Sequence, residues 1–251
     1  MLSVIILTCN EEKNIARALQ SVSFADELIV VDDGSTDRTK EIAVQNHAQV
    51  IPHPLSDDFS SARNFGTMHA KGDWVLQIDA DEELTKNLAD EIKKITESAN
   101  ADDVYFLRRR DFFWGRDLTY GETSKVRNKG LIRLFKKNTG EFKGKVHEEF
   151  VSTGKAGRLN GFINHYPHPT IKEFLNDINH YSTVRAHALK NQGVKPNVFV
   201  IIFFPFFKFL TTYFIFLGFL DGAPGFVYAF MMSFHSFLVR SKLYQYSEID
   251  T

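Results

Sequence analysis

The sequence has very little cysteine and no excess of charge of either sign. Cys9 is the only cysteine among 251 residues, which excludes a disulfide framework and a cysteine-rich zinc site. The chain carries 30 Lys and Arg against 31 Asp and Glu, so it lacks the general cationic field of a protein that coats nucleic acid. Apolar residues make up 43% and charged residues 24%, which is enough to build a core and excludes a disordered chain.

The chain also has no predicted N-terminal signal peptide, because Met1 is followed at once by a strand-like run and then by charges. We therefore expect its catalytic part to lie in the cytoplasm. Phenylalanine, by contrast, occurs 24 times, and 13 of these residues lie between Phe199 and Phe237. Because two compositions are joined in one chain, we predict a first domain over 1–192 and a membrane-associated helical region over 193–251.

Residues 1–170 alternate between short apolar runs and amphipathic segments. Strands are predicted at 3–8, 27–32, 49–51 and 73–78, and helices at 11–22, 37–45, 60–70 and 84–95. This alternation predicts an α/β fold in which helices cover a mostly parallel sheet. Further strand-like pieces are expected to extend the sheet at 104–107, 131–135, 145–151 and 161–166, before a helix from 171 to about 190.

The tail contains two long apolar stretches. From Val198 to Leu220, 23 residues include one charged side chain, Lys208. As a helix this stretch would extend about 34 Å, enough to cross a bilayer core of about 30 Å. Pro205 and Lys208 near its middle do not suit a simple span, and a turn at 221–225 leads to a second stretch at 226–239. Basic residues flank both outer ends, so we predict a re-entrant or interfacial hairpin, with a buried helical pair or a dimer contact as the alternative.

Acidic and polar residues follow the predicted strands where each strand ends. Residues 8–11 follow the first strand, 32–37 the second, and 79–82 the fourth. Ligands of open α/β sheets bind at the carboxyl ends of strands, so we expect the three clusters to form one site. Asp79 and Asp81 on a tight turn could hold a hard divalent cation, although acidic residues at a helix N-terminus give the same pattern.

Four ordered motifs resemble those of the inverting family 2 glycosyltransferases. They are TCNEEKNI at 8–15, VVDDGSTD at 30–37, SARNFG at 61–66 and QIDADE at 77–82. The resemblance covers roughly residues 1–100 and implies the GT-A fold, a Rossmann-like sheet flanked by helices, here followed by a C-terminal hydrophobic helical hairpin. Segments 146–149, 164–166 and 218–222 resemble the bacterial subgroup of β-1,4-glucosyltransferase type that adds sugars to lipopolysaccharide core.

The resemblance implies which residues bind a UDP-sugar donor. They are Thr8, Asn10, Glu11, Asp33, Arg63 and Asp79. Asp33 would accept a hydrogen bond from the uracil N3–H, which suits an ionised carboxylate, while Asp32 would support the turn. Arg63 would reach the base or the diphosphate with its several donors, or else form a surface ion pair.

The resemblance also implies a divalent cation, Mg²⁺ or Mn²⁺. Asp81 would be its main ligand, with Asp79 beside it, and His165 or His168 would supply a further contact unless it is an ordinary loop histidine. The cation would stabilise the negative charge that builds on the departing nucleoside diphosphate.

Inversion by a single displacement needs a base that removes a proton from the acceptor hydroxyl. Glu148 is the candidate and Glu149 the second choice, because adjacent strand residues point to opposite faces and only one of them can face the sugar. Both glutamates could instead be solvated strand residues. His147 could orient the base or a phosphate.

We therefore predict a hexosyltransferase that moves glucose from a UDP-sugar to a glycolipid such as lipopolysaccharide core. It would bind the membrane surface as a peripheral or monotopic protein on the cytoplasmic face of the bacterial inner membrane. Polyprenyl phosphate is the alternative acceptor, and a catalytically silent membrane adaptor is a third possibility. Basic residues between Lys125 and Lys137 could meet phosphorylated sugars or anionic headgroups, or form a solvated face. They are too local to imply nucleic acid, and the oligomeric state stays open.

Overall fold

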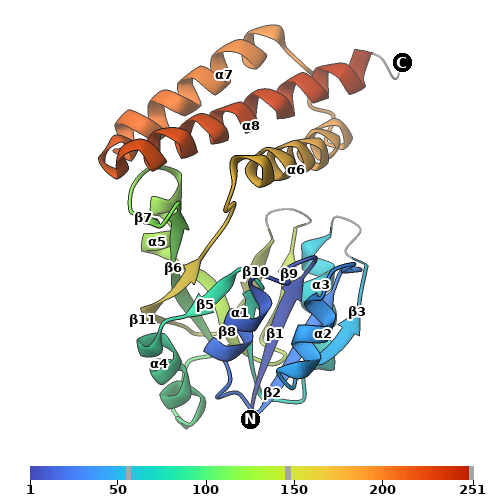
Figure 1. Cartoon of the computed structure of the whole chain (residues 1–251), viewed down its shortest axis with the longest axis vertical. Helices are drawn as coiled ribbons and strands as arrows, with labels where there is room; N and C mark the ends of the chain where they lie inside the picture. The colour runs from blue at the N-terminus through green and yellow to red at the C-terminus, as the bar shows by residue number, and fades with distance from the viewer. Residues whose placement is uncertain (55–57, 145–147, 249–251) are drawn as a thin grey trace. The chain divides into compact units, whose positions relative to one another are not determined.

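The computed structural model describes residues 1–54, 58–144 and 148–248. Its chain divides into two compact units: unit 1 comprises Met1–Arg110 and Val126–His165, and unit 2 comprises Asp111–Lys125 and the chain from Tyr166 onward (Figure 1). The boundary predicted at residue 192 follows composition alone and stays a prediction. Each unit is described by itself below.

Unit 1 is built on a mixed β-sheet. Its parallel strands are, in spatial order, β3 (Gln49–Pro52), β2 (Glu27–Asp32), β1 (Leu2–Thr8) and β4 (Trp74–Asp79). The order continues through β8 (Leu131–Lys136), β6 (Val104–Phe113), β11 (Ala156–His165) and β5 (Glu82–Leu84). The β4–β8, β6–β8 and β11–β5 pairs are antiparallel, so the sheet is mixed beyond its first four strands. A separate antiparallel hairpin joins β9 (Gly140–Lys143) to β10 (Glu149–Ser152).

Helices cover both faces of the parallel strands, which explains why β1 is apolar along its whole length. In unit 1 the helices are α1 (Ile15–Ser21), α2 (Thr39–Gln45), α3 (Phe59–His69) and α4 (Lys86–Thr96). Val4 and Ile6 belong to one buried cluster, and Ile5 and Leu7 belong to another, because successive strand residues point to opposite faces. The predicted α/β fold class is therefore confirmed.

Helix α3 packs very closely on the sheet at Gly66. A Cβ atom at this position would lie 2.6 Å from Cγ2 of Ile5 and 3.0 Å from Cγ2 of Val31. Absence of a side chain thus lets the helix approach β1 and β2. The same approach fixes the position of Arg63, one helical turn earlier.

Unit 2 contains the long helices α6 (Ile171–Asn191), α7 (Val198–Leu210) and α8 (Gly222–Glu248). A π-helical turn at Thr211–Ile215 and a 3-10 turn at Gly218–Asp221 connect α7 to α8. Helix α8 contacts α6 along one side and α7 along another, and Figure 1 shows it between them. The unit also includes β7 (Arg116–Leu118), a 3-10 turn at Gly121–Thr123, and the start of α5 (Ser124–Lys129). The predicted C-terminal helical pair is confirmed.

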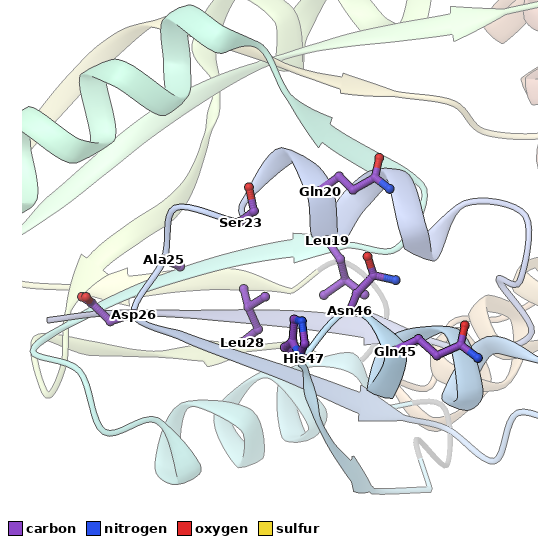
Figure 2. Close-up of a pocket in the computed structure, with 9 residues that line it drawn as sticks. All are labelled: Leu19, Gln20, Ser23, Ala25, Asp26, Leu28, Gln45, Asn46 and His47. Carbon is purple, nitrogen blue, oxygen red and sulfur yellow. The ribbon is translucent and has the colours of Figure 1, made fainter.

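A half-open hollow of about 350 Å³ lies in unit 1 beside the end of α1 and the end of α2 (Figure 2). Leu28 at the start of β2 and His47 after α2 line it, so it lies near the amino ends of the parallel strands. The carboxylate of Asp26, another lining residue, accepts the backbone N–H of Leu2 at 2.7 Å. Because ligands of such sheets bind at the opposite edge, we do not assign the active site to this hollow.

Replacing Gly66 with alanine should destabilise unit 1 by about 1–3 kcal/mol, because the new methyl group overlaps Ile5. Urea unfolding followed through the fluorescence of buried Trp74 would measure this. Met68→Ala on the same helix is the control, since Met68 is 69% exposed and should tolerate the change. Equal stability of the two variants would contradict the close packing of α3 on β1.

Candidate active site

The three polar clusters meet at one edge of the sheet. Strand β1 lies between β2 and β4, with Thr8 paired to Asp32 and Leu7 paired to Asp79. The strands are parallel, so their carboxyl ends lie side by side. The loops that carry the first three motifs therefore begin from adjacent positions, as the sequence predicts.

Asn10 connects the first motif to the second. Its backbone N–H donates to Oγ of Ser35 at 2.9 Å, and its side-chain Oδ1 accepts the backbone N–H of Thr36 at 2.8 Å. Asn10 has φ 55°, a left-handed conformation that asparagine tolerates better than most residues. The two loops thus form one hydrogen-bonded rim.

Residues around Glu11 belong to this rim and not to a helix. The backbone N–H of Glu11 donates to Oγ1 of Thr39 at 2.8 Å, and its carboxylate accepts from Nδ2 of Asn14 at 2.7 Å. The helix predicted from 11 accordingly begins later, at Ile15. That predicted start was wrong because cross-loop hydrogen bonds outweigh the local helical preference of these residues. Asp37, the predicted N-cap of the next helix, lies one residue before the observed N-cap Arg38, and its Oδ1 accepts the backbone N–H of Thr39 at 3.0 Å.

Asp32 and Asp33 have different surroundings. The Asp32 side chain is 2% exposed and accepts the backbone N–H of Ser35 at 3.1 Å, so its predicted support of the turn is confirmed. Asp33 is half-buried, and its backbone N–H donates to the carbonyl oxygen of Thr8 at 3.0 Å. Oγ1 of Thr8 is buried and has no hydrogen-bond partner within the described part of the chain, which leaves a polar group at the end of β1 for a water or ligand.

The centre of the site is the guanidinium of Arg63, whose side chain is 2% exposed. Its Nη2 donates to Oδ1 of Asp79 at 2.7 Å, and its Nε donates to Oε1 of Glu148 at 2.8 Å. Nη1 lies 3.4 Å from Oε1 of Gln77. The alternative that Arg63 forms a surface ion pair is therefore excluded, and Arg63 instead joins two acidic residues that lie 69 positions apart in the sequence.

The β9–β10 hairpin is fastened to the helix that carries Arg63. Nδ2 of Asn64 donates to the carbonyl oxygen of Phe142, and the backbone N–H of Phe142 donates to Oδ1 of Asn64, both at 2.9 Å. The Arg63 guanidinium also lies over the Phe142 ring, 5.5 Å from its centroid. Glu148, which immediately precedes β10, is thus held against α3.

Arg133 is a second arginine of the site, and sequence reasoning missed it. Its Nη2 donates to Oδ2 of Asp79 at 3.1 Å, and the residue is 5% exposed. Arg133 belongs to the basic stretch between Lys125 and Lys137, for which contact with phosphorylated sugars or anionic headgroups, or a solvated face, is predicted; for Arg133 this prediction is wrong, because its side chain is buried against Asp79. Apolar neighbours on both sides in a predicted strand were the available signal, because a charged residue between them must point into the sheet or its edge.

The charges in this cluster determine which groups stay ionised. Burial opposes ionisation of Asp79, but the positive charges of Arg63 and Arg133 outweigh it and hold the Asp79 pKa well below its usual range. Glu82 has the opposite shift, because burial and then the charge of Asp79 raise its pKa. Oε2 of Glu82 accepts the backbone N–H of Asp79 at 3.0 Å, and Arg109 lies 3.5 Å from Oε1.

Asp81 faces His165 at the other side of the same turn. Nε2 of His165 lies 3.1 Å from Oδ2 of Asp81, and although burial opposes ionisation, the charge and hydrogen bond of His165 lower the Asp81 pKa. His168, the other candidate, has its Nδ1 2.9 Å from Asp177 and stacks on Phe174 in unit 2.

Together, Asp81 and His165 supply one carboxylate and one imidazole. Both oxygens of Asp79 are engaged by arginines. In the residues that the structure describes, no group of three or more His, Cys, Asp or Glu side chains converges as a metal site. A cation here would therefore take most of its ligands from phosphate oxygens and water, which is usual for Mg²⁺.

The structure separates the two candidate bases. Glu148 has a side chain 13% exposed and bound to Arg63, whereas Glu149 is exposed at the start of β10. The roles predicted for them are not tested by this geometry. His147 lies outside the described residues, as does the first part of the strand predicted at 145–151.

Comparison with known proteins places these observations in a family. The model of the family described as glycosyl transferase family 2 matches residues 3–160. An uncharacterised glycosyltransferase of Rickettsia typhi is 35% identical over 257 residues, covering 98% of this chain and 87% of that protein. The lipopolysaccharide core biosynthesis glycosyltransferase LpsC of Rhizobium meliloti is 28% identical over 253 residues, covering 97% of this chain and 92% of that protein. The similarity thus extends into the C-terminal helices.

Solved structures support the same fold. Residues 1–349 of Staphylococcus aureus TarS, in complex with UDP, match with a TM-score of 0.51 over 98% of this chain and 91% of that one. The sequence identity is 16%, so this likeness concerns the fold alone. It agrees with the GT-A fold that the four motifs imply.

The low Asp79 pKa should make unit 1 sensitive to acid. Ionised Asp79 stabilises the folded state fully above the unfolded pKa of about 3.9, and this contribution is lost as pH falls toward the lower folded value. Asp79→Asn removes the titration, so its free energy of unfolding should fall less steeply between about pH 5 and pH 2. Urea unfolding at a series of pH values measures the slopes. Asp73→Asn, at an 89% exposed carboxylate, should keep the wild-type slope, and the same slope in Asp79→Asn would contradict the account.

Proposed function

Because the chain belongs to glycosyl transferase family 2, we propose that it moves a hexose, glucose in the first instance, from a UDP-sugar to a glycolipid of the lipopolysaccharide core type. The proposed reaction is a metal-assisted single displacement with inversion. The observation that carries it is the chain of ion pairs Asp79–Arg63–Glu148, which joins the donor side of the sheet edge to the candidate base. The LpsC relative, similar along 97% of this chain, supports the choice of acceptor.

The donor nucleoside is assigned to the rim formed by the first two motifs. The carboxylate of Asp33 is an acceptor without a proton, which suits the N3–H of uracil. Thr8, Asn10 and Glu11 border the same edge, and the unsatisfied hydroxyl of Thr8 supplies a free polar group there. UDP is the nucleotide in the TarS complex, one of the solved structures that share this fold.

The cation is assigned to Asp81 and His165, with Asp79 beside them. A carboxylate oxygen and an imidazole nitrogen are a donor set that Mn²⁺ or Mg²⁺ accepts when phosphate oxygens and water complete the shell. When bound, the cation supplies charge neutralisation at the diphosphate. Asp79, shared by two arginines, serves in this proposal to align the sugar and to keep both guanidinium groups in place.

Glu148 is assigned as the base. It takes the proton of the acceptor hydroxyl, the oxygen bonds to the anomeric carbon, and the bond to the diphosphate breaks with its electron pair on UDP. Arg63 holds Glu148 at 2.8 Å and thereby fixes the distance between the base and Asp79. A phosphate acceptor, as in polyprenyl-phosphate glycosyltransferases, is already deprotonated and would not need this residue.

Glu148→Gln should lower kcat about 10²–10⁴-fold, because the amide cannot accept the proton. Glu149→Gln is the matched control and should retain most activity, since Glu149 is exposed. The assay follows UDP release from a panel of UDP- and GDP-sugars with Mn²⁺ or Mg²⁺ and extracted lipid acceptors. UDP binding by the Glu148→Gln variant should remain, which separates loss of the base from misfolding.

The outcomes of that experiment discriminate between the candidate functions. Activity that survives Glu148→Gln indicates a phosphate acceptor and contradicts the sugar-hydroxyl reaction. If the wild-type chain turns over none of the donors with any acceptor, the proposal that it is an enzyme is contradicted, and a catalytically silent adaptor is favoured.

Asp81→Asn should weaken Mn²⁺-dependent UDP binding by about tenfold or more, because the neutral amide is a poorer ligand for a hard cation. Calorimetric titration with UDP, with and without Mn²⁺, measures the effect. Asp90→Asn, at an exposed position of α4, is the control. An equal loss of UDP binding in the absence of metal would contradict the assignment of Asp81 to the cation.

A further inference from the structure

Unit 2 exposes an unusually large apolar surface. Two of its stretches, Val198–Ile215 and Gly218–Ser247, are long and apolar enough to cross a membrane by length and composition. Only 11% of the first is buried, and its exposed side chains continue onto the turn and along one stripe of α8. We call this surface the phenylalanine face; its phenylalanines are Phe199, Phe203, Phe204, Phe206, Phe207, Phe214, Phe216, Phe219, Phe226, Phe230 and Phe237.

The turn between α7 and α8 is bound to a polar segment of the same unit. The buried carboxylate of Asp221 accepts the backbone N–H groups of Thr119 and Tyr120, the latter at 2.9 Å. The backbone N–H of Gly121 donates to the carbonyl oxygen of Phe216 at 2.8 Å. Segment 111–125 is joined at both ends to unit 1 in the chain, so a span that ended at this turn would have to carry the segment across the membrane with it.

The last turn of α7 is bound to the same segment. Nζ of Lys208 lies 2.6 Å from Oε2 of Glu122, and Oγ1 of Thr212 donates to the same oxygen at 3.3 Å. A crossing helix would place both charges deep in the hydrocarbon, where ionised side chains are costly. The ion pair instead gives α7 one polar edge, opposite in character to its exposed phenylalanines.

The far end of α8 is bound to polar groups of α6. Nζ of Lys242 donates to the side chains of Asn179, Ser182 and Thr183 at 2.7–2.8 Å, and Nζ of Lys190 donates to the carbonyl oxygen of Tyr246 at 2.6 Å. Helix α6 buries Phe174, Ile178, Ser182 and Ala186 at four-residue spacing; its exposed residues are mostly polar, with Ile171, Leu175 and Tyr181 as the exposed large apolar side chains. One side of α8 is therefore covered by α6, which contributes polar groups to the contact.

From these contacts we infer that α7 and α8 lie in the plane of one membrane leaflet, with the phenylalanine face immersed and with neither helix crossing the bilayer. Polar contacts hold the pair at the last turn of α7, at the turn itself and at the far end of α8, and α6 packs along α8 between these points. Between residues 198 and 247, Asp221 is the only acidic residue, so nothing on the phenylalanine face repels anionic headgroups. This arrangement goes beyond the proposed reaction and does not depend on its donor or acceptor.

The first test measures binding to lipid vesicles by flotation. The double variant Phe203→Asp, Phe207→Asp should reduce the bound fraction at least tenfold, because two charges enter the immersed face. Val44→Asp is the matched control, since Val44 is 61% exposed on α2 in unit 1 and should not affect binding. Far-UV circular dichroism of both variants excludes a loss of folding. If the wild-type chain fails to float and the double variant only converts a dimer to a monomer, the face is a contact between copies, which overturns the inference.

The second test distinguishes lying in the membrane from crossing it. In a Cys9→Ser background, the single substitutions Leu220→Cys in the turn and Gln245→Cys near the end of α8 each provide one thiol for a fluorescent NBD label. The labelled protein is added to preformed vesicles, and dithionite, which does not cross the bilayer, is added outside. Both labels should be quenched almost completely before detergent is added. A label at Leu220 that stays protected until detergent is added would show a crossing and overturn the inference.

Discussion

The active site depends on one buried positive charge, the guanidinium group of Arg63. Arg63 is 2% exposed, and a guanidinium at that depth is tolerated only when anions surround it. Asp79 from the end of β4 and Glu148 from beside β10 supply those anions, and each ion pair is under 3 Å. Because the Arg63 charge must be neutralised by anions, α3, the end of β4 and the start of β10 are held together, although they lie far apart in the sequence. In a family 2 glycosyltransferase these are the segments in which the reaction is proposed to occur.

The Arg63 guanidinium also gives the neighbouring carboxylates different surroundings. Two arginines occupy Asp79, and their charges keep it ionised, whereas Asp81 turns to His165 only two residues later. Glu82, buried beside Asp79, has a raised pKa because that negative charge is already present. Three acidic residues within four positions of the sequence therefore have three different environments, which a motif alone does not express.

Sequence reasoning located the motifs and the first four strands along the chain, because alternating apolar runs and strand-end acids are local signals. It missed contacts that join distant segments. The pairing of Arg63 with Glu148 spans 85 positions, and Arg133 lay unnoticed in a stretch of lysines and arginines. The first helix was predicted from residue 11 but begins at Ile15, since the hydrogen bonds that hold Asn10 and Glu11 come from another loop. The local propensity of a segment cannot predict hydrogen bonds that come from a distant part of the chain.

The tail shows why composition alone leaves its membrane arrangement open. Helix α7 is apolar nearly all round, a pattern typical of a span or a buried helix. Its polar edge comes from another part of the chain, where Glu122 pairs with Lys208. The amphipathic character required for a position in the plane of a leaflet is thus a property of the assembled unit, in which α6 and segment 111–125 cover one side and leave the phenylalanines on the other. Lys208, awkward for a crossing helix, becomes the residue that fixes which edge of α7 is polar.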